Sequence, residues 1–177
     1  GVQFEPPVKD EITIEWERTG ACGVLKLTTL KVHATNMSFN EGDPVLFYYD
    51  DKLIFAGYVF TKKRDRQHHI EVTCYDQIRY LKNKFTYVFE NKTATQIIQA
   101  MCNDFKLSLG AMDNTSYVLP AISKENCSAL DIVCDVLEDT LVNTGNMFVL
   151  YDDGGKITLK NCANMISNTL IFEETAE

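Results

Sequence analysis

The chain has 177 residues, 45% of them hydrophobic and 24% charged, which excludes a disordered or low-complexity protein and allows one domain or two small ones. The 17 basic residues against 25 acidic ones leave a formal net charge of −8, so the chain as a whole is repelled by nucleic-acid phosphates and by anionic lipid surfaces. No apolar stretch approaches the roughly 20 residues of a membrane-spanning helix, so we expect a soluble globular protein with neither nucleic acid nor a membrane as its partner.

The start of the chain alternates between apolar and polar residues, which is the pattern of a strand with one face in water. Over residues 11–17, Ile12, Ile14 and Trp16 fall on one face, and three carboxylates and a threonine fall on the other. Two glycines interrupt the pattern, which resumes over residues 24–30. We therefore expect two strands here, with Trp16 on the dry face of the first.

A hairpin is expected next. A group of turn-forming residues precedes two β-prone runs, 45–49 and 53–60, which a spacer of turn length separates. Gly57 inside the second run favours a bulge or bend that curves the sheet. Residues 70–74 alternate again, so the first half of the chain predicts at least five antiparallel strands.

Two amphipathic helices follow. Thr93 and Gln96 have the spacing of a capping box, and Ser128 is the expected N-cap of a second helix that ends at Gly145. Apolar residues recur at helical spacing in both segments, as Ala94, Ile97, Ile98, Met101 and Phe105 in the first and as Leu130, Val133, Cys134, Leu137 and Leu141 in the second.

The chain then returns to strand patterns, because residues 147–151 and 156–159 flank a turn and form a second hairpin. The whole pattern predicts an α+β fold. Residues 1–85 form its first domain, a curved antiparallel β-barrel-like sheet. Residues 86–177 form a smaller α/β segment with two helices and a hairpin.

No residue pattern supports catalysis. The histidines are a lone His33 and the adjacent His68 and His69, and no nucleophile, phosphate-binding or metal-binding motif accompanies them. The aspartate pairs 50–51 and 152–153 lie in the expected hairpin turns, where a polar turn is a better interpretation than metal ligands or paired catalytic carboxylates. We therefore expect no enzyme activity, no catalytic residue, no cofactor and no metal.

One local charge anomaly stands out in this acidic chain. Lys62, Lys63, Arg64 and Arg66 lie within a single short segment, and His68 follows them. Two interpretations are open: a solvated loop tip, or a basic loop that meets an acidic surface on another subunit. The second interpretation makes these five residues a candidate subunit-interface loop.

Several segments match a known family in a fixed order. They are residues 41–47, 53–60, 72–84, 91–95 with the helix that follows, 143–145 and 151–161. Together they resemble the XkdQ/YqbQ proteins of PBSX-like defective prophages, over most of the chain. That family is similar in turn to the late-control gene D proteins of contractile-tailed phages and to the baseplate hubs shared with type VI secretion spikes.

The resemblance implies a structural baseplate hub subunit of a contractile phage tail or phage-tail-like particle, linking the tail tube to the central spike. Such hubs are trimers whose barrel-like domains form a pseudo-sixfold ring, so the expected partners are the tube, the spike and further copies of the chain. The expected location is the bacterial cytoplasm during assembly and the tail particle afterwards.

The ends of the chain suggest a piece of such a hub. Gly1 stands without an initiator methionine, which we interpret as a cleaved tag or a trimmed start. Family members continue past the position of Glu177 with a further β-rich half. We therefore expect the first half of a hub, which by itself is a monomer or a weak oligomer.

The alternative function is a small β-rich module that binds carbohydrate or peptide on the same fold class. A hub predicts assembly and no small-molecule pocket. A binding module predicts a monomer with exposed aromatic residues in a groove. A cell-wall hydrolase, the third possibility, lacks a candidate pair of acid and nucleophile.

The six cysteines stand singly in apolar runs, so we expect free thiols in a reducing compartment, with one or two long-range bridges as the alternative. Only Cys127 and Cys134 are close in sequence, and two helical turns, about 10 Å, exceed the reach of a disulfide. Titration with Ellman's reagent in denaturant without reductant is expected to return all six thiols. A clearly lower count would mean that bridges are present.

Overall fold

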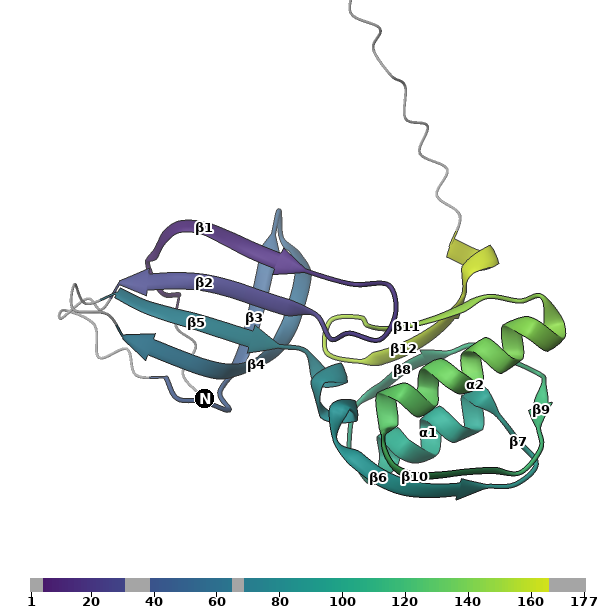
Figure 1. Ribbon diagram of the computed structural model, residues 1–177. Coiled ribbons are helices and arrows are strands. Elements are labelled where there is room, and N and C mark those ends of the chain that lie inside the picture. The colour runs from purple at the N-terminus through teal and green to yellow at the C-terminus, as the bar shows by residue number, and fades with distance from the viewer. Residues whose placement is uncertain (1–4, 31–38, 65–68, 166–177) are drawn as a thin grey trace, which may run out of the picture.

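The computed structural model describes residues 5–30, 39–64 and 69–165 (Figure 1). The first part of the chain forms one strongly curled antiparallel sheet, and the rest forms small sheets with two helices. The α+β fold class predicted from the change of period along the sequence is confirmed. We call the described residues up to Tyr75 the β-half and those from Gln77 onward the α/β-half.

The sheet of the β-half has five strands in the order β1-β2-β5-β4-β3, and all neighbours are antiparallel. Its strands are β1 (Val8–Glu15), β2 (Val24–Leu30), β3 (Pro44–Tyr49), β4 (Lys52–Arg64) and β5 (His69–Tyr75). The sheet curls around its own core, made of Leu25, Phe55, Val59, Ile70, Val72 and Cys74. Ile12 and Ile14 of β1 pack against this core, as their alternation predicts.

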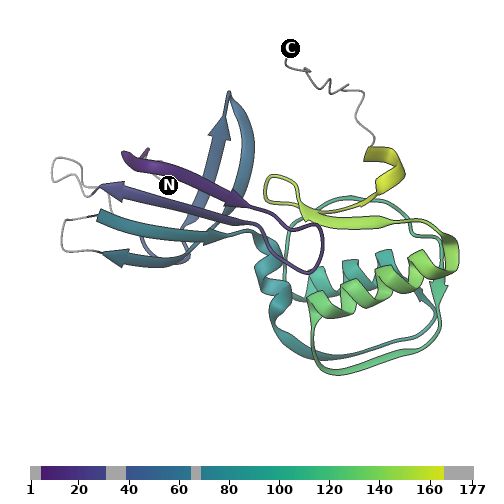
Figure 2. The same ribbon diagram turned by 45° about the horizontal axis from the view of Figure 1, so that its top comes forward.

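The α/β-half contains three small sheets, β6-β10, β11-β12-β8 and β7-β9. Its elements are η1 (Gln77–Lys82), β6 (Lys84–Phe89), β7 (Lys92–Thr93), α1 (Ala94–Asp104), β8 (Leu109–Met112), β9 (Val118–Leu119), β10 (Ile122–Ser128), α2 (Ala129–Thr144), β11 (Phe148–Asp152), β12 (Ile157–Asn161) and η2 (Cys162–Met165). In both views the helices lie between the β11-β12-β8 sheet and the β6-β10 pair (Figures 1 and 2). A second core therefore forms around the helices, separate from that of the β-half.

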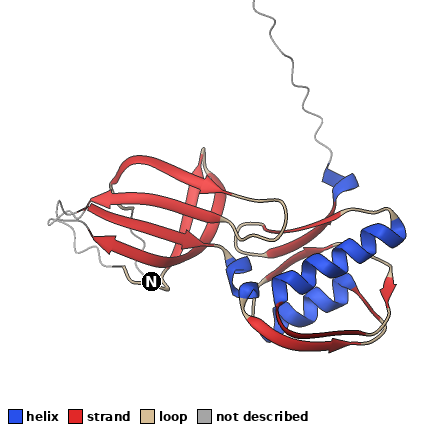
Figure 3. Ribbon diagram, in the orientation of Figure 1, coloured by secondary structure: helices blue, strands red, loops and turns tan. Residues whose placement is uncertain are grey.

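Local signals place both helices where the sequence predicts them (Figure 3). The Thr93 side chain accepts from the Gln96 backbone N–H at 3.3 Å, and the Gln96 side chain accepts from the Thr93 N–H at 3.1 Å. Ser128 caps α2 by accepting from the Asp131 N–H at 3.1 Å. Gly145 ends α2 with a left-handed φ of 71°, a conformation that costs glycine little. The predicted caps are confirmed.

Both predicted hairpins are also confirmed. Asp50 and Asp51 have φ of 48° and 60°, the left-handed pair that a two-residue turn between twisted strands needs. Gly154 and Gly155, with φ of 59° and 88°, lie in the turn between β11 and β12. The aspartate pairs 50–51 and 152–153 therefore lie at hairpin turns, as predicted.

The prediction for Trp16 is wrong. Strand β1 ends at Glu15, and Trp16 lies in the loop that follows, 56% exposed. Alternation predicts which side a residue faces only while the strand continues. Here the chain leaves the sheet at Trp16 and crosses to the α/β-half, where Cys22 is buried in the helical core.

Gly57 does not form the bulge that its position suggests. It pairs directly with Val45, and the irregular positions of β4 lie opposite the Phe47–Tyr48 step and after Val59. A side chain at Gly57 would overlap the carbonyl oxygen of Tyr75. Glycine is required here because two backbones approach closely.

Gly57→Ala is expected to lower the free energy of unfolding by about 2 kcal/mol or more, because the clash is with backbone that cannot move away. Gly20→Ala is the matched control, since Gly20 has a φ of 73° and open space around it. The control should cost only the left-handed strain, about 1 kcal/mol. Urea denaturation measures both, and equal losses would contradict the close approach at Gly57.

Candidate functional site

The basic segment does not form one loop. Lys62, Lys63 and Arg64 are the last residues of strand β4 and pair with β5. Arg66 and His68 lie outside the described residues. At least the first three members of the predicted interface loop are therefore held on a strand rather than on a loop tip.

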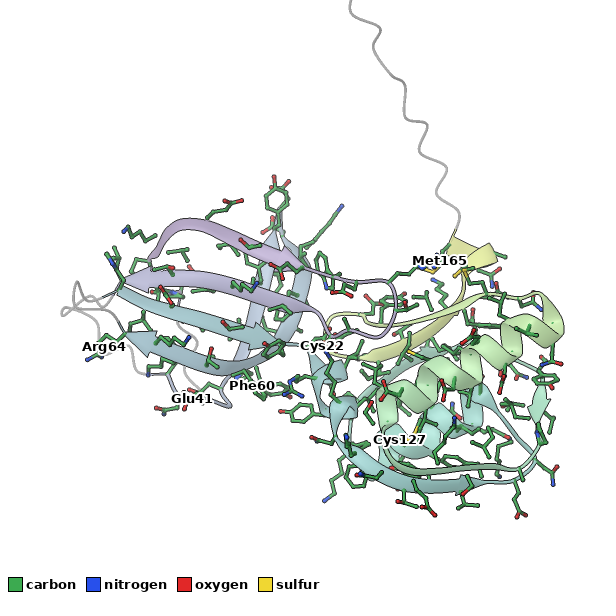
Figure 4. The ribbon with its side chains drawn as sticks, in the orientation of Figure 1. Cys22, Glu41, Phe60, Arg64, Cys127 and Met165 are labelled. Atoms are coloured by element: carbon green, nitrogen blue, oxygen red, sulfur yellow. The ribbon has the colours of Figure 1, made fainter. Side chains whose placement is uncertain are left out.

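Lys62 and its two neighbours differ in their surroundings. The Lys62 ammonium donates to the carbonyl oxygen of Phe39 and lies 4.6 Å from the centroid of that ring, so Lys62 helps to hold the β-half together. Lys63 and Arg64 are exposed, with Lys63 opposite Glu71 on β5. Arg64 lies at the end of the β-half that is remote from the α/β-half (Figure 4). Lys63 and Arg64 are thus the described members that a partner could reach.

The two aspartate pairs have different roles. Asp50 and Asp51 are exposed at the tip of the β3–β4 hairpin. Asp152 is half-buried and accepts from the Gly155 N–H at 2.5 Å, which closes the second turn. Among the described residues, no group of three or more His, Cys, Asp or Glu side chains could hold a metal ion.

Asp76 lies where the two halves meet. Its Oδ2 accepts from the Gly23 N–H at 2.6 Å, and its Oδ1 accepts from the Ile78 N–H at 3.0 Å. The first bond fixes the loop between β1 and β2, and the second caps η1. One buried carboxylate therefore ties a loop of the β-half to the first helix of the α/β-half.

Gln77 ties a third segment to the same place. Its side-chain amide donates to the carbonyl oxygen of Gly155, and its amide oxygen accepts from the Ser108 N–H at 2.9 Å. Its backbone N–H points at Asp152 Oδ2 at 3.4 Å. The turn of the second hairpin and the segment before β8 are thereby held against η1.

Aromatic rings also pack at this junction, which is the contact between the β-half and η1 with the second hairpin. The Arg79 guanidinium lies 5.0 Å from the ring centroid of Phe60 and 5.8 Å from that of Tyr75. Phe60 and Tyr75 meet edge to face at 5.1 Å. Tyr58 and Tyr80 meet in the same way at 6.2 Å. Stacking and cation–π contacts therefore join β4 of the β-half to η1.

The junction holds two carboxylates with altered acidity. Burial raises the pKa of Asp76 to about 7, and the negative charge of Asp152 acts in the same direction. The N–H groups of Gly23 and Ile78 oppose this shift by stabilising the charged form. Burial also raises the pKa of Asp152. Both groups hold their protons to a higher pH than a solvated aspartate does.

An open apolar groove with a volume of about 440 Å³ lies between α2, strand β11 and residues 18–21. All five apolar residues predicted as the stripe of α2 line it: Leu130, Val133, Cys134, Leu137 and Leu141. Leu130 and Val133 are buried, but the other three are only partly covered. The predicted stripe therefore coincides with the core face of α2 only in part. Ile132 and Val136 lie outside the stripe and are also fully buried.

The groove fits neither expectation from sequence. A hub predicts no pocket, whereas a carbohydrate-binding module predicts exposed aromatic rings. Phe148 is the one aromatic residue among the described residues that line the groove, and it is buried. The remaining walls are mainly aliphatic and sulfur-bearing, with Arg18 and Glu138 as their charged residues.

The sequence reasoning missed the junction and the groove. A signal for Asp76 was present, because an aspartate just after a β-prone run, here one residue beyond Tyr75, is a preferred N-cap. Gln77 carried no comparable signal, since its partners Ser108 and Gly155 are distant in sequence.

The pKa of Asp76 predicts a pH dependence of stability. Its folded pKa lies above the unfolded value of 3.8, so its contribution to stability is complete below about pH 4 and is lost as the pH rises through about 7. Lowering the pH from 8 to 5 should therefore raise the free energy of unfolding by about 2 kcal/mol. Asp76→Asn, measured by urea denaturation at both pH values, should remove this difference. A variant with the wild-type pH dependence would exclude Asp76 as its source.

The fold is similar to that of a solved tail protein. The 43 kDa tail protein of prophage MuSo2 from Shewanella oneidensis matches with a TM-score of 0.62 and 16% sequence identity, over 80% of this chain and 46% of that one. Within the described residues, no helix has the length and apolar character to cross a membrane.

Two relatives from Bacillus subtilis (strain 168) are similar in sequence. Uncharacterized protein YqbQ is 32% identical over 157 residues, and phage-like element PBSX protein XkdQ is 33% identical over 157 residues. Each match covers 86% of this chain and 48% of the relative, so the chain spans about half the length of these proteins. The family model described as YQBQ-like matches residues 12–176. The resemblance noted in the sequence is thus confirmed, and the chain belongs to the YQBQ-like family.

Proposed function

We propose that this chain is a structural tail protein of a PBSX-like prophage element and part of the hub that joins the tail tube to the spike. The observation that carries the proposal is the family match over residues 12–176. One relative is named as a protein of the phage-like element PBSX, and the similar fold is that of a prophage tail protein. The role is structural rather than catalytic, in keeping with these names.

The contacts between the two halves support a role in transmitting force along the tail. A subunit that joins two parts of a particle transmits force well only if its own parts do not bend against each other. The junction meets this need with the two hydrogen bonds of Asp76, the bonds of Gln77 and the rings around Arg79. Each half also has its own core.

The proposed assembly is a homotrimer of two-domain subunits, with residues 1–85 as the first domain and residues 86–177 as the second. The tube and the spike are the further partners. Lys63 and Arg64 are proposed to lie at a subunit contact, together with Arg66 and His68. Their positive charge in a chain with a net charge of −8 supports this, because it offers each copy a surface that attracts the others.

The hub position can be tested in the particle itself. The chromosomal gene is given an epitope tag, the prophage is induced, and purified particles are examined by immunogold electron microscopy. Label at the end of the tube that carries the spike is expected. Label along the tube, or none on intact particles, would contradict the hub proposal.

The subunit contact can be tested by removing charge at its exposed members. The double variant Lys63→Gln/Arg64→Gln, in the product of the complete gene, should form less trimer in light scattering. Neutralisation is preferred to reversal because Lys63 lies opposite Glu71. The matched control is Lys84→Gln/Lys92→Gln, which removes two exposed cations of the α/β-half.

The melting temperature of the 177-residue chain should change by about 2 °C or less in both variants, because the residues are exposed. Unchanged trimer in the first variant, or equal loss in both, would contradict a specific contact at β4. The 177-residue chain itself is expected to be a monomer or a weak oligomer.

A further inference from the structure

The Asp76 and Asp152 side chains both lie at the start of η1. Two successive backbone N–H groups of this helix point at them: that of Gln77 at Asp152 and that of Ile78 at Asp76. Each carboxylate also holds a loop from elsewhere, through the Gly23 N–H for Asp76 and the Gly155 N–H for Asp152. The N-terminus of the short helix η1 therefore faces two carboxylates, and each of these carboxylates also binds a loop.

The charges around this pair do not neutralise it. The titratable and charged groups nearby are Cys22 from the β1–β2 loop, Tyr75 from β5, Arg79 and Lys82 from η1, Asp152 from β11 and Asp153 next to it. Among the described residues, no cation forms an ion pair with Asp76 or Asp152. The Arg79 guanidinium lies over Phe60 and Tyr75 instead. A fully ionised pair would therefore be two like charges in a poorly hydrated site.

The loop that Asp76 holds also forms a wall of the apolar groove. Residues 18–21 line the groove, and Cys22 is buried in the helical core. Gly23, at the end of this loop, lies tightly between Asp76 and Trp16: an added Cβ would lie 2.7 Å from Asp76 Oδ2 and 2.9 Å from the Trp16 indole. Movement of the loop away from Asp76 would shift this wall and expose Cys22.

We propose that Asp76 and Asp152 form a proton-operated clasp, which holds the loop that walls the groove while the pair retains a proton and releases this loop when both carboxylates are ionised. In the closed state one carboxyl group is protonated, which removes the repulsion, and Gly23 stays against Asp76. In the open state, the repulsion between the two carboxylates and their rehydration outweigh the Gly23 N–H bond, which by itself favours the charged form of Asp76, so the loop 16–23 moves and the groove widens. The device is independent of the tail role.

The raised pKa of both carboxylates supports the clasp, and the Asp76 pKa of about 7 places the change close to neutral pH. The direction follows from the same physics: the closed state binds the proton more tightly, so low pH favours it. Opening is local and is distinct from the global loss of stability.

Trp16 is the chain's one tryptophan and lies against Gly23, so its fluorescence reports on the clasp. Emission and acrylamide quenching of the native protein are measured from pH 5 to pH 9. The expected result is a single transition with its midpoint near pH 7, with stronger quenching on the alkaline side. Circular dichroism in parallel should show that the protein stays folded throughout.

Asp76→Asn should abolish the transition, and Glu90→Gln, which removes an exposed acid of the α/β-half, should leave it unchanged. Asp152→Asn is the second variant, which keeps the test decisive if Asp76→Asn does not fold. Removing the like charge should move the midpoint down by about one pH unit.

Alkylation provides a second readout. Cys22 and Cys102 are both buried thiols, and burial raises the pKa of both, so the pH affects their thiolate fractions in a similar way. The ratio of Cys22 to Cys102 modification, measured by mass spectrometry, should rise above pH 7 if the clasp opens. A constant ratio would contradict opening.

Two fluorescence results would overturn the clasp. A flat Trp16 signal in the wild-type protein would mean that the loop does not respond to pH. A transition that persists in folded Asp76→Asn, or that keeps its midpoint in Asp152→Asn, would assign the titration to another group, such as a histidine.

Discussion

The structure depends on one buried carboxylate that is shared between two parts of the chain. Asp76 accepts from Gly23 of the β1–β2 loop and from Ile78 of η1, and it follows directly on the last strand of the β-half. A carboxylate loses much hydration when it is buried, and only well-placed donors compensate for this loss. The two N–H groups do so only when loop and helix hold their observed positions. The desolvation of a single group therefore constrains how the halves sit against each other.

Close backbone approach is the second constraint on the same junction. An added Cβ at Gly154 would lie 3.0 Å from the Leu53 side chain, and one at Gly155 would lie 3.3 Å from Ala56. The turn of the second hairpin thus rests on strand β4, and Gln77 holds it there through Gly155. Side chains on the turn would push the halves apart and lengthen these hydrogen bonds. Small residues and a buried acid together make a contact that tolerates little sliding, because interiors pack closely.

Local signals in the sequence predicted the elements that local interactions determine. The Thr93 capping box, the Gly145 stop and the hairpin turn at Asp50 depend on neighbours in sequence, and all three were predicted. The pairings of β6 with β10 and of β8 with β12 were not predicted, because their partners lie tens of residues apart and no turn links them. The candidate site followed the same division. A run of cations is visible in the sequence, but its place on a strand, the junction and the groove depend on the tertiary fold.

Helix α2 explains why a correct apolar pattern led to an incomplete prediction. Its residues Leu130 and Val133 line the groove while also contributing to the core, and Ile132 and Val136 extend the buried surface beside them. An amphipathic helix that covers one core needs a single apolar stripe with polar residues on the rest of its surface. The apolar surface of α2 is wider than one stripe, and the excess lies where Cys134 and Leu137 are only partly covered. The sequence feature that corresponds to the groove is thus an apolar surface on α2 that is wider than the core requires. The loop that Asp76 holds covers part of this surface, because residues 18–21 form a wall of the groove.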